Sequence, residues 1–279
     1  MQNITYASEN RLKIVASIAP LADFARQVGG NKVDVLLLLP PGSSPHTYEP
    51  TPRIMRDISN AKVFIKIGAG LEFWADRLIR SGTDRILTVD SSEGIELIRD
   101  IHDSHHHSEG EGADPHIWLD PAICMKIINR IASAFSKVDP SNSAHFKKNA
   151  SAYIEKLVNL DREIADRVKL FRKKQYITFH PAWNYFSKRY GLTVAGVIEE
   201  GPGKEPNPKH LTKILQELRR INSRIVFAET QFNPKIAEAI AQEAGAQVLF
   251  LDPIGGQKNR ETYIDMMRYN ISIMEKAMK

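Results

Sequence analysis

Three histidines and one aspartate stand where strands or compact turns of the predicted fold end. His46 comes after VDVLLLLPPGSSP, His180 follows QYITF, Asp252 follows AQVLFL, and His116 lies within ADPHIWLDP. Three neutral imidazoles and one carboxylate form a ligand set that suits a divalent transition metal, and zinc above all. The four side chains are far apart in the sequence, so only a fold that brings them together can make such a site.

Each of these residues also has a simpler interpretation. A single histidine in a loop is more often a surface residue or a hydrogen-bonding group than a metal ligand. However, His46, His180 and Asp252 all follow predicted strands, and an open parallel sheet presents its ligand site at the carboxyl ends of its strands. The aspartates that flank His116 either orient its imidazole or cap local turns.

Two further features accompany these candidates. The segment IHDSHHHSEGEGADP contains four histidines among acidic residues and glycines, at positions 102 and 105–107. Such a tract binds metal weakly or is simply a solvated loop, and we do not place it in the primary site. Aromatic residues near the candidates either wall the site against water or pack in the core; they are Trp118, Trp183, Tyr185 and Phe186.

The elements that must position these residues alternate between strand and helix. In the first half, strands are predicted at 12–18, 33–39, 62–68 and 85–90, with helices at 21–30, 53–61 and 71–81 between them. The second half repeats the alternation, with strands at 175–179, 192–198, 224–229 and 247–251 and helices at 183–191, 207–221, 233–245 and 260–278. This βαβ rhythm predicts α/β lobes with open parallel sheets.

Between the halves, residues 141–173 contain neither proline nor glycine, and their apolar residues recur every three or four positions. This spacing predicts one long amphipathic helix, for which a helical hairpin is the alternative. We therefore expect an N-terminal lobe at 11–140, a linking helix at 141–173 and a C-terminal lobe at 174–279.

Composition narrows the class of protein. The single cysteine excludes an intramolecular disulfide, and the longest aliphatic run, Val35–Leu39, is too short to cross a bilayer. The formal charge of +5 comes from basic residues interleaved with acidic ones, so we expect no nucleic-acid partner. The first residues lack the pattern of a signal peptide, which fits either a cytoplasmic protein or an exported one whose leader is not in this chain.

Four motifs together carry a family resemblance. GSSPHTYEP, DPHIWLDP, FHPAWNYF and LDPIGG, in this order and with a long helix before the third, resemble the metal-binding solute receptors of ABC importers (cluster A-I). The resemblance implies two α/β lobes joined by one long helix, with a divalent metal bound in the cleft between them. The matching ligand positions are His46, His116, His180 and Asp252, although in LDP-type relatives a water molecule can replace the aspartate.

The resemblance also implies cargo, partner and location. A histidine at position 180, where manganese receptors have a glutamate, favours Zn²⁺ as the transported ion, with Mn²⁺ as the second expectation. We expect a monomer that is periplasmic or otherwise extracytoplasmic, either free or lipid-anchored, and that works with a membrane ABC permease. The expectation is a receptor and not an enzyme.

Two other uses of a metal stay open from the residues. A zinc hydrolase would need an open position for water and a placed general base, and the chain has no HExxH motif. A purely structural metal is the other alternative, but a chain of this length does not need one to fold.

Overall fold

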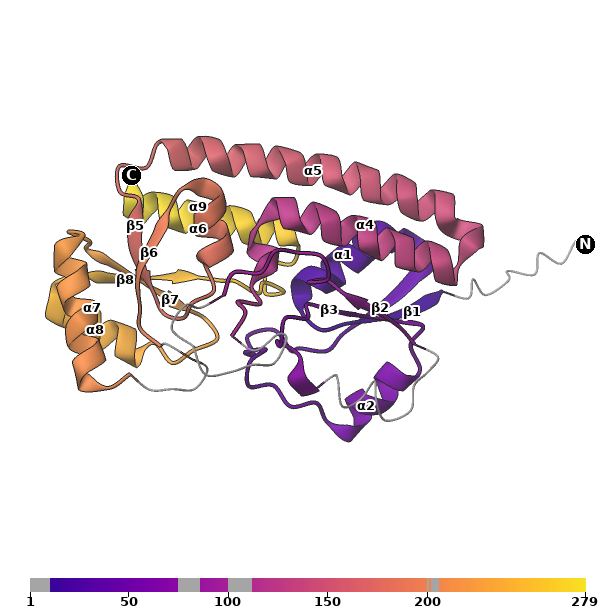
Figure 1. Cartoon of the computed structure of the whole chain (residues 1–279), viewed down its shortest axis with the longest axis horizontal. Helices are drawn as coiled ribbons and strands as arrows, with labels where there is room; N and C mark the ends of the chain where they lie inside the picture. Colours follow the sequence, from indigo (N-terminus) through magenta and orange to yellow (C-terminus); the bar gives the residue numbers. More distant parts are fainter. Residues whose placement is uncertain (1–10, 75–85, 100–111, 200, 202–205) are drawn as a thin grey trace, which may run out of the picture.

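The computed structural model describes residues 11–74, 86–99, 112–199, 201 and 206–279. Within them lie two parallel four-stranded sheets, one in each half of the chain, which confirms the predicted α/β fold class (Figure 1). The strands are β1 (Leu12–Ala16), β2 (Val33–Leu37), β3 (Val63–Lys66), β4 (Leu87–Asp90), β5 (Gln175–Thr178), β6 (Thr193–Val197), β7 (Ile225–Glu229) and β8 (Gln247–Leu251).

Helices cover these sheets, and all except α4, for which no range was predicted, overlap a predicted helix. They are α1 (Ala19–Gly29), α2 (Pro52–Ser59), α4 (Pro121–Val138), α5 (Ser143–Lys169), α6 (Asn184–Tyr190), α7 (Pro208–Arg220), α8 (Lys235–Ala244) and α9 (Tyr263–Met278). Short 3₁₀ helices are η1 (Gly30–Lys32), η2 (Ile117–Leu119) and η3 (Pro140–Asn142). The helix predicted at 71–81 and the histidine tract at 102–107 lie mostly or wholly outside the described residues.

Both sheets have the same strand order. In the first sheet it is β2-β1-β3-β4, and in the second it is β6-β5-β7-β8, with every pairing parallel. In each sheet the chain passes from its earliest strand, β1 or β5, to the neighbour on one side and then to the neighbour on the other side. The loops that leave the carboxyl ends of these strands therefore diverge at that point. Such a switch point is the usual place for a ligand in an open α/β sheet.

The long helix α5 runs along the top of both lobes in Figure 1. Its buried side chains recur every three or four residues and form one apolar face; they are Phe146, Ala150, Tyr153, Leu157, Leu160, Ile164 and Val168. The prediction of a single continuous helix is confirmed, but α5 ends at Lys169, four residues before the predicted end. Beyond it, the backbone N–H groups of Arg172 and Lys173 donate to the carbonyl of Met278, so tertiary hydrogen bonds replace helical ones.

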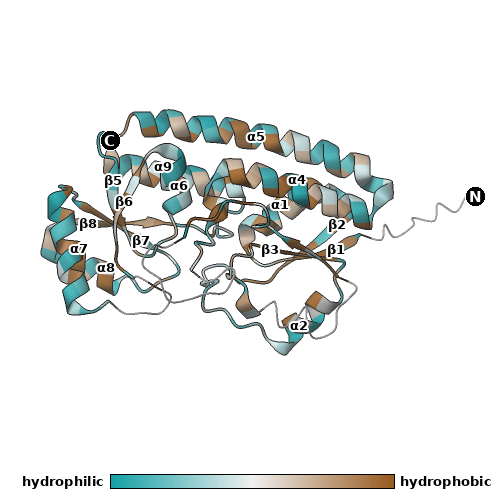
Figure 2. Cartoon of the chain, viewed as in Figure 1, coloured by the Kyte–Doolittle hydropathy of each residue, from teal (hydrophilic) through white to brown (hydrophobic). Residues whose placement is uncertain are grey.

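One hydrophobic core connects the two lobes. The largest cluster of buried side chains joins α1, α4 and α5 of the first half to α6, α9 and the inner face of the second sheet. A smaller core lies under α7 and α8 on the outer face of the second sheet, and another lies beside α2 on the first. Figure 2 shows the strands largely brown and the outer turns of α5 and α7 teal. Because apolar packing is continuous, the lobes are held together by more than the linking helix.

Helix starts follow local chemistry. Asn207 precedes Pro208, and its side-chain oxygen accepts a hydrogen bond from the N–H of His210 at 2.9 Å. Asn233 lies one residue before the N-cap Pro234, and its side-chain oxygen accepts from the N–H of Lys235, the first residue of α8, at 3.1 Å; α8 thus begins two residues after the predicted start at 233. Both contacts satisfy amides that the first helical turn leaves free. Within the described part of the chain, none of the helices has the length and apolarity needed to cross a membrane.

Candidate metal centre

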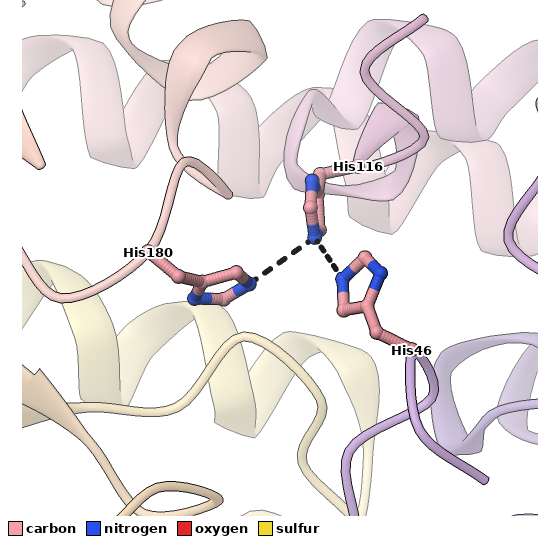
Figure 3. Close-up of side chains that lie close together, drawn as sticks. All are labelled: His46, His116 and His180. Carbon is pink, nitrogen blue, oxygen red and sulfur yellow. Dashed lines mark hydrogen bonds between the residues drawn. The ribbon is translucent and has the colours of Figure 1, made fainter. Parts of the chain in front are cut away.

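The structure brings the three predicted histidines together. His46 lies in the loop after β2, His116 immediately precedes η2, and His180 follows the last residues of β5. The Nε2 atom of His116 is 3.1 Å from that of His46 and 3.3 Å from that of His180 (Figure 3). Ligand-type atoms of all three residues lie within 4.8 Å of one another. Two residues come from the first lobe and one from the second, so the group lies between the lobes.

The spacing of these nitrogens matches a metal site. A zinc ion about 2.05 Å from each nitrogen of a tetrahedral shell would separate those nitrogens by about 3.3 Å. The two measured separations, 3.1 and 3.3 Å, are close to this value. Small rearrangements of side chains are therefore sufficient to place the three rings around one ion.

Asp114 orients the ring of His116. Its Oδ1 atom is 2.7 Å from the Nδ1 atom of His116 and also accepts from the backbone N–H of that residue at 2.9 Å. Its Oδ2 atom accepts from Asn184 of the second lobe at 3.0 Å. With Nδ1–H donated to a carboxylate, the lone pair of Nε2 is free to bind a metal. The other flanking aspartate, Asp120, instead caps α4 by accepting from the N–H of Ala122.

Glu229 has the same relation to His180, and sequence reasoning missed it. This fully buried glutamate is the last residue of β7, and its Oε2 atom is 2.7 Å from the Nδ1 atom of His180. Its Oε1 atom accepts from the indole N–H of Trp183 at 3.3 Å. The rule that identified His46 and His180, a polar residue at the carboxyl end of a strand, applies to Glu229 as well and could have found it.

His46 differs from the other two histidines in its surroundings. It is partly exposed, whereas His116 and His180 are 3% and 8% exposed. Burial, and next the nearby charges of His116 and His180, lower the pKa of His46 from 6.5 to about 2. The ring is consequently neutral at physiological pH, which is the form that binds a metal.

The fourth predicted ligand, Asp252, is placed differently from the prediction. Among the described residues, the gathered ligand-type atoms are those of the three histidines, and no oxygen of Asp252 is among them. Its Oδ1 atom accepts from the N–H groups of Ile254 and Gly255 at 3.1 and 2.8 Å and from the side chain of Gln231 at 3.2 Å. Its Oδ2 atom is 3.2 Å from Nε of Arg260. One oxygen of the carboxylate is thus held by three donors, and the other faces Arg260.

A small pocket adjoins the three rings. Besides the histidines, the residues that line it come from the His46 loop and from the loops after β7 and β8; they are Ser44, Pro45, Glu229, Gln231, Phe232, Pro253 and Ile254. The ring of Phe232 lies 5.0 Å from that of His180, centroid to centroid. Apolar side chains thus border part of the site and limit the access of water.

The aromatic residues noted in the sequence serve mainly as packing and as ties between lobes. All four are buried. The indole N–H of Trp118, two residues after His116, donates to the carbonyl of Pro253 in the second lobe at 2.6 Å. The hydroxyl of Tyr185 donates to the carbonyl of Asp114 at 3.0 Å. These bonds fix the His116 segment of the first lobe to the second.

Comparisons with known proteins agree with this geometry. Residues 14–277 match the family described as the periplasmic component A of zinc-uptake complexes. The chain is 31% identical to the high-affinity zinc uptake system protein ZnuA of Bacillus subtilis over 281 residues, which cover 96% of this chain and 88% of the relative. It is 28% identical to the zinc-binding lipoprotein AdcA of Streptococcus pneumoniae, with 97% of this chain but only 56% of that relative covered.

Solved structures show the same fold. A crystal structure of ZnuA superimposes with a TM-score of 0.87 at 30% identity, covering 97% of this chain and all of the other. The laminin-binding protein of Streptococcus agalactiae, described as having adhesin and metal-transporting activity, superimposes with a TM-score of 0.85 at 28% identity over 97% of this chain and the whole of that one.

Proposed function

The chain belongs to the family of the periplasmic component A of zinc-uptake complexes, and on this basis we propose that it captures a zinc ion between its two lobes and delivers it to a membrane ABC permease. The Nε2 atoms of His46, His116 and His180 bind the ion. Zinc is then the cargo of the protein, which releases it unchanged.

The observation that carries this proposal is the convergence of three Nε2 atoms from two lobes. Their separations of 3.1 and 3.3 Å suit a tetrahedral zinc shell. Asp114 supports the proposal because it accepts from Nδ1 of His116, and Glu229 supports it because its Oε2 atom lies 2.7 Å from Nδ1 of His180. A ligand set drawn from two lobes suits reversible capture, since a small movement of one lobe separates the ligands.

Zinc is preferred over manganese because of the donor atoms. Three imidazole nitrogens suit zinc, whereas manganese favours oxygen ligands. Manganese therefore binds to the same histidines more weakly. Metal analysis of the protein as purified, followed by competitive titration with zinc and manganese, compares the two directly.

The two nearest carboxylates favour a receptor over the alternative of a zinc hydrolase. A hydrolase needs a general base within hydrogen-bond reach of a metal-bound water. Asp114 and Glu229 are each engaged with a ring nitrogen of His116 or His180 and act on the metal through those rings.

In the same proposal the receptor acts as a monomer outside the cytoplasm, with lobes 11–140 and 174–279 joined by 141–173.

The decisive test removes one ligand. In His180→Ala, zinc affinity measured by calorimetry falls strongly, while the far-UV circular dichroism spectrum stays that of the wild type. His145→Ala is the matched control, because that histidine lies on α5 and bonds to the carbonyl of Gly29, away from the centre. Unchanged zinc affinity in His180→Ala would refute the site.

A further inference from the structure

Gln231 is a polar residue in the pocket whose role neither the fold nor the three histidines explain. It lies two residues after β7 and lines the same pocket as His46, His116 and His180. Its side-chain N–H₂ group donates to Asp252 Oδ1 at 3.2 Å. Its amide oxygen, Oε1, is buried and has no hydrogen-bond partner among the described residues. A buried acceptor without a donor is costly, so the contact it lacks is expected to come from a bound species.

The orientation of this amide is set by Asp252. A carboxylate only accepts hydrogen bonds, so the amide must turn its N–H₂ group toward Asp252 and its oxygen away from it. Asp252 is itself held by the N–H groups of Ile254 and Gly255 and by Arg260. The amide oxygen of Gln231 is consequently fixed before any metal arrives, and the carboxylate that fixes it is the one expected from the sequence to be a ligand.

The chemistry of zinc indicates what this oxygen contacts. Three histidines leave one position of a tetrahedral shell open, and zinc commonly fills such a position with water. Amide oxygens are not among the usual ligands of zinc, but they are good hydrogen-bond acceptors. A water molecule polarised by zinc is a strong donor.

We propose that Gln231 is a positioning residue of the metal centre, whose Oε1 atom accepts a hydrogen bond from a water molecule in the fourth coordination position of the bound ion. This inference rests on the proposed function, because it assumes that the three histidines hold the metal. Asp252 then supports the metal through Gln231 and the water, without direct coordination.

A fixed acceptor next to the fourth position also selects what can occupy it. Water or another ligand with a proton satisfies Oε1. An anion such as azide, which presents only lone pairs, leaves Oε1 unpaired and is repelled by it. The site therefore prefers water to anions, and removing the acceptor weakens that preference.

The test compares wild type, Gln231→Leu and the control Gln242→Leu, an exposed glutamine on α8. Each protein is loaded with Co²⁺, whose visible spectrum reports its ligands, and titrated with azide; zinc affinity is measured separately by competition. In Gln231→Leu we expect zinc to bind about tenfold more weakly, in line with the loss of other outer-shell partners. We expect azide to bind the cobalt protein about tenfold more tightly, since no acceptor is left unpaired. Gln242→Leu should match the wild type in both.

The outcomes separate this inference from the proposed function. Equal azide affinities in wild type and Gln231→Leu would overturn the role of Gln231, because general damage to the fold does not strengthen anion binding. If His180→Ala still loses zinc in that case, the receptor proposal stands alone. A wild-type protein whose zinc binding is indifferent to His180→Ala would overturn both. Urea unfolding of metal-free Gln231→Leu, with Gln231→Met as a second variant, confirms that a folded protein was compared.

Discussion

Replacing Glu229 by glutamine tests the metal centre without touching a ligand. The glutamate is fully buried; its Oε1 atom accepts from the indole N–H of Trp183 at 3.3 Å, and its Oε2 atom lies 2.7 Å from Nδ1 of His180. A glutamine keeps the shape but has one accepting oxygen and one donating N–H₂ group. One of the two donors must then face another donor, and no bulk water is present to replace the lost acceptor.

The magnitude follows from these contacts. Hydrogen bonds to charged groups contribute about 1.5–3 kcal/mol and neutral ones about 1 kcal/mol, so the change of charge alone costs about 0.5–2 kcal/mol. The loss is greatest when zinc is bound, because the metal makes Nδ1–H a stronger donor. We therefore expect zinc to bind about ten- to hundredfold more weakly, which is the usual range for outer-shell partners of a ligating histidine.

Competition between the protein and a chromophoric chelator at neutral pH measures this change. Glu217→Gln is the matched control, because Glu217 pairs with Arg220 on the outside of α7 and has no contact with the centre. Urea unfolding of the metal-free variant separates any loss of stability from the loss of affinity. Equal zinc affinities in Glu229→Gln and the wild type would show that Glu229 does not act on the metal through His180.

Three further predictions concern other parts of the chain. The pKa of His46 in the folded protein, about 2, is below its ordinary value of 6.5, so the unfolded chain binds one more proton between these pH values. The free energy of unfolding of the metal-free protein should therefore fall as the pH drops below 6.5. Urea titrations should show a smaller fall in His46→Asn. Leu157→Ala should cost about 2–5 kcal/mol in urea unfolding because that side chain is fully buried on the inner face of α5, whereas Val158→Ala, at an exposed position of the same helix, should cost little. Deleting residues 104–111 should lower the zinc stoichiometry in equilibrium dialysis or the capture rate in stopped-flow measurements. If the deletion also abolished the tight site, the assignment of the primary site would be wrong.

Much of the fold was predictable because the periodicity of apolar residues in the sequence indicates the helices and strands. All eight described strands occur where apolar runs predict them, and α7 and α8 begin within two residues of the predicted starts at 207 and 233. The end of α5 was not predictable from the same signals. No proline or glycine ends the helix after Lys169; hydrogen bonds from Arg172 and Lys173 to the carbonyl of Met278 do so, and that partner is at the other end of the chain. A contact of this kind has no local signature.

The site shows the same division between local and tertiary information. His46 and His180 were identifiable as ligand-type residues that follow strands, and His116 was identifiable by its place in the ADPHIWLDP segment. Asp252 satisfied the same criteria, yet its carboxylate accepts from N–H groups two and three residues ahead, at Ile254 and Gly255. Short-range bonding to the backbone is what aspartate does most readily in a turn.

Whether a carboxylate coordinates the metal or only supports a ligand therefore depends on which protein donors lie within its reach. Asp114, Glu229 and Asp252 all stand near the three rings, and each is occupied by N–H groups of the protein. Among the described residues the three imidazoles gather at a common point, and the carboxylates lie around them as anionic partners. Such a centre attracts a dication through the outer charges and holds it through nitrogen, and removing one outer carboxylate should weaken binding without altering the number of ligands. The Glu229→Gln measurement therefore tests both the role of Glu229 and the wider assignment of the imidazoles as ligands and the carboxylates as supports.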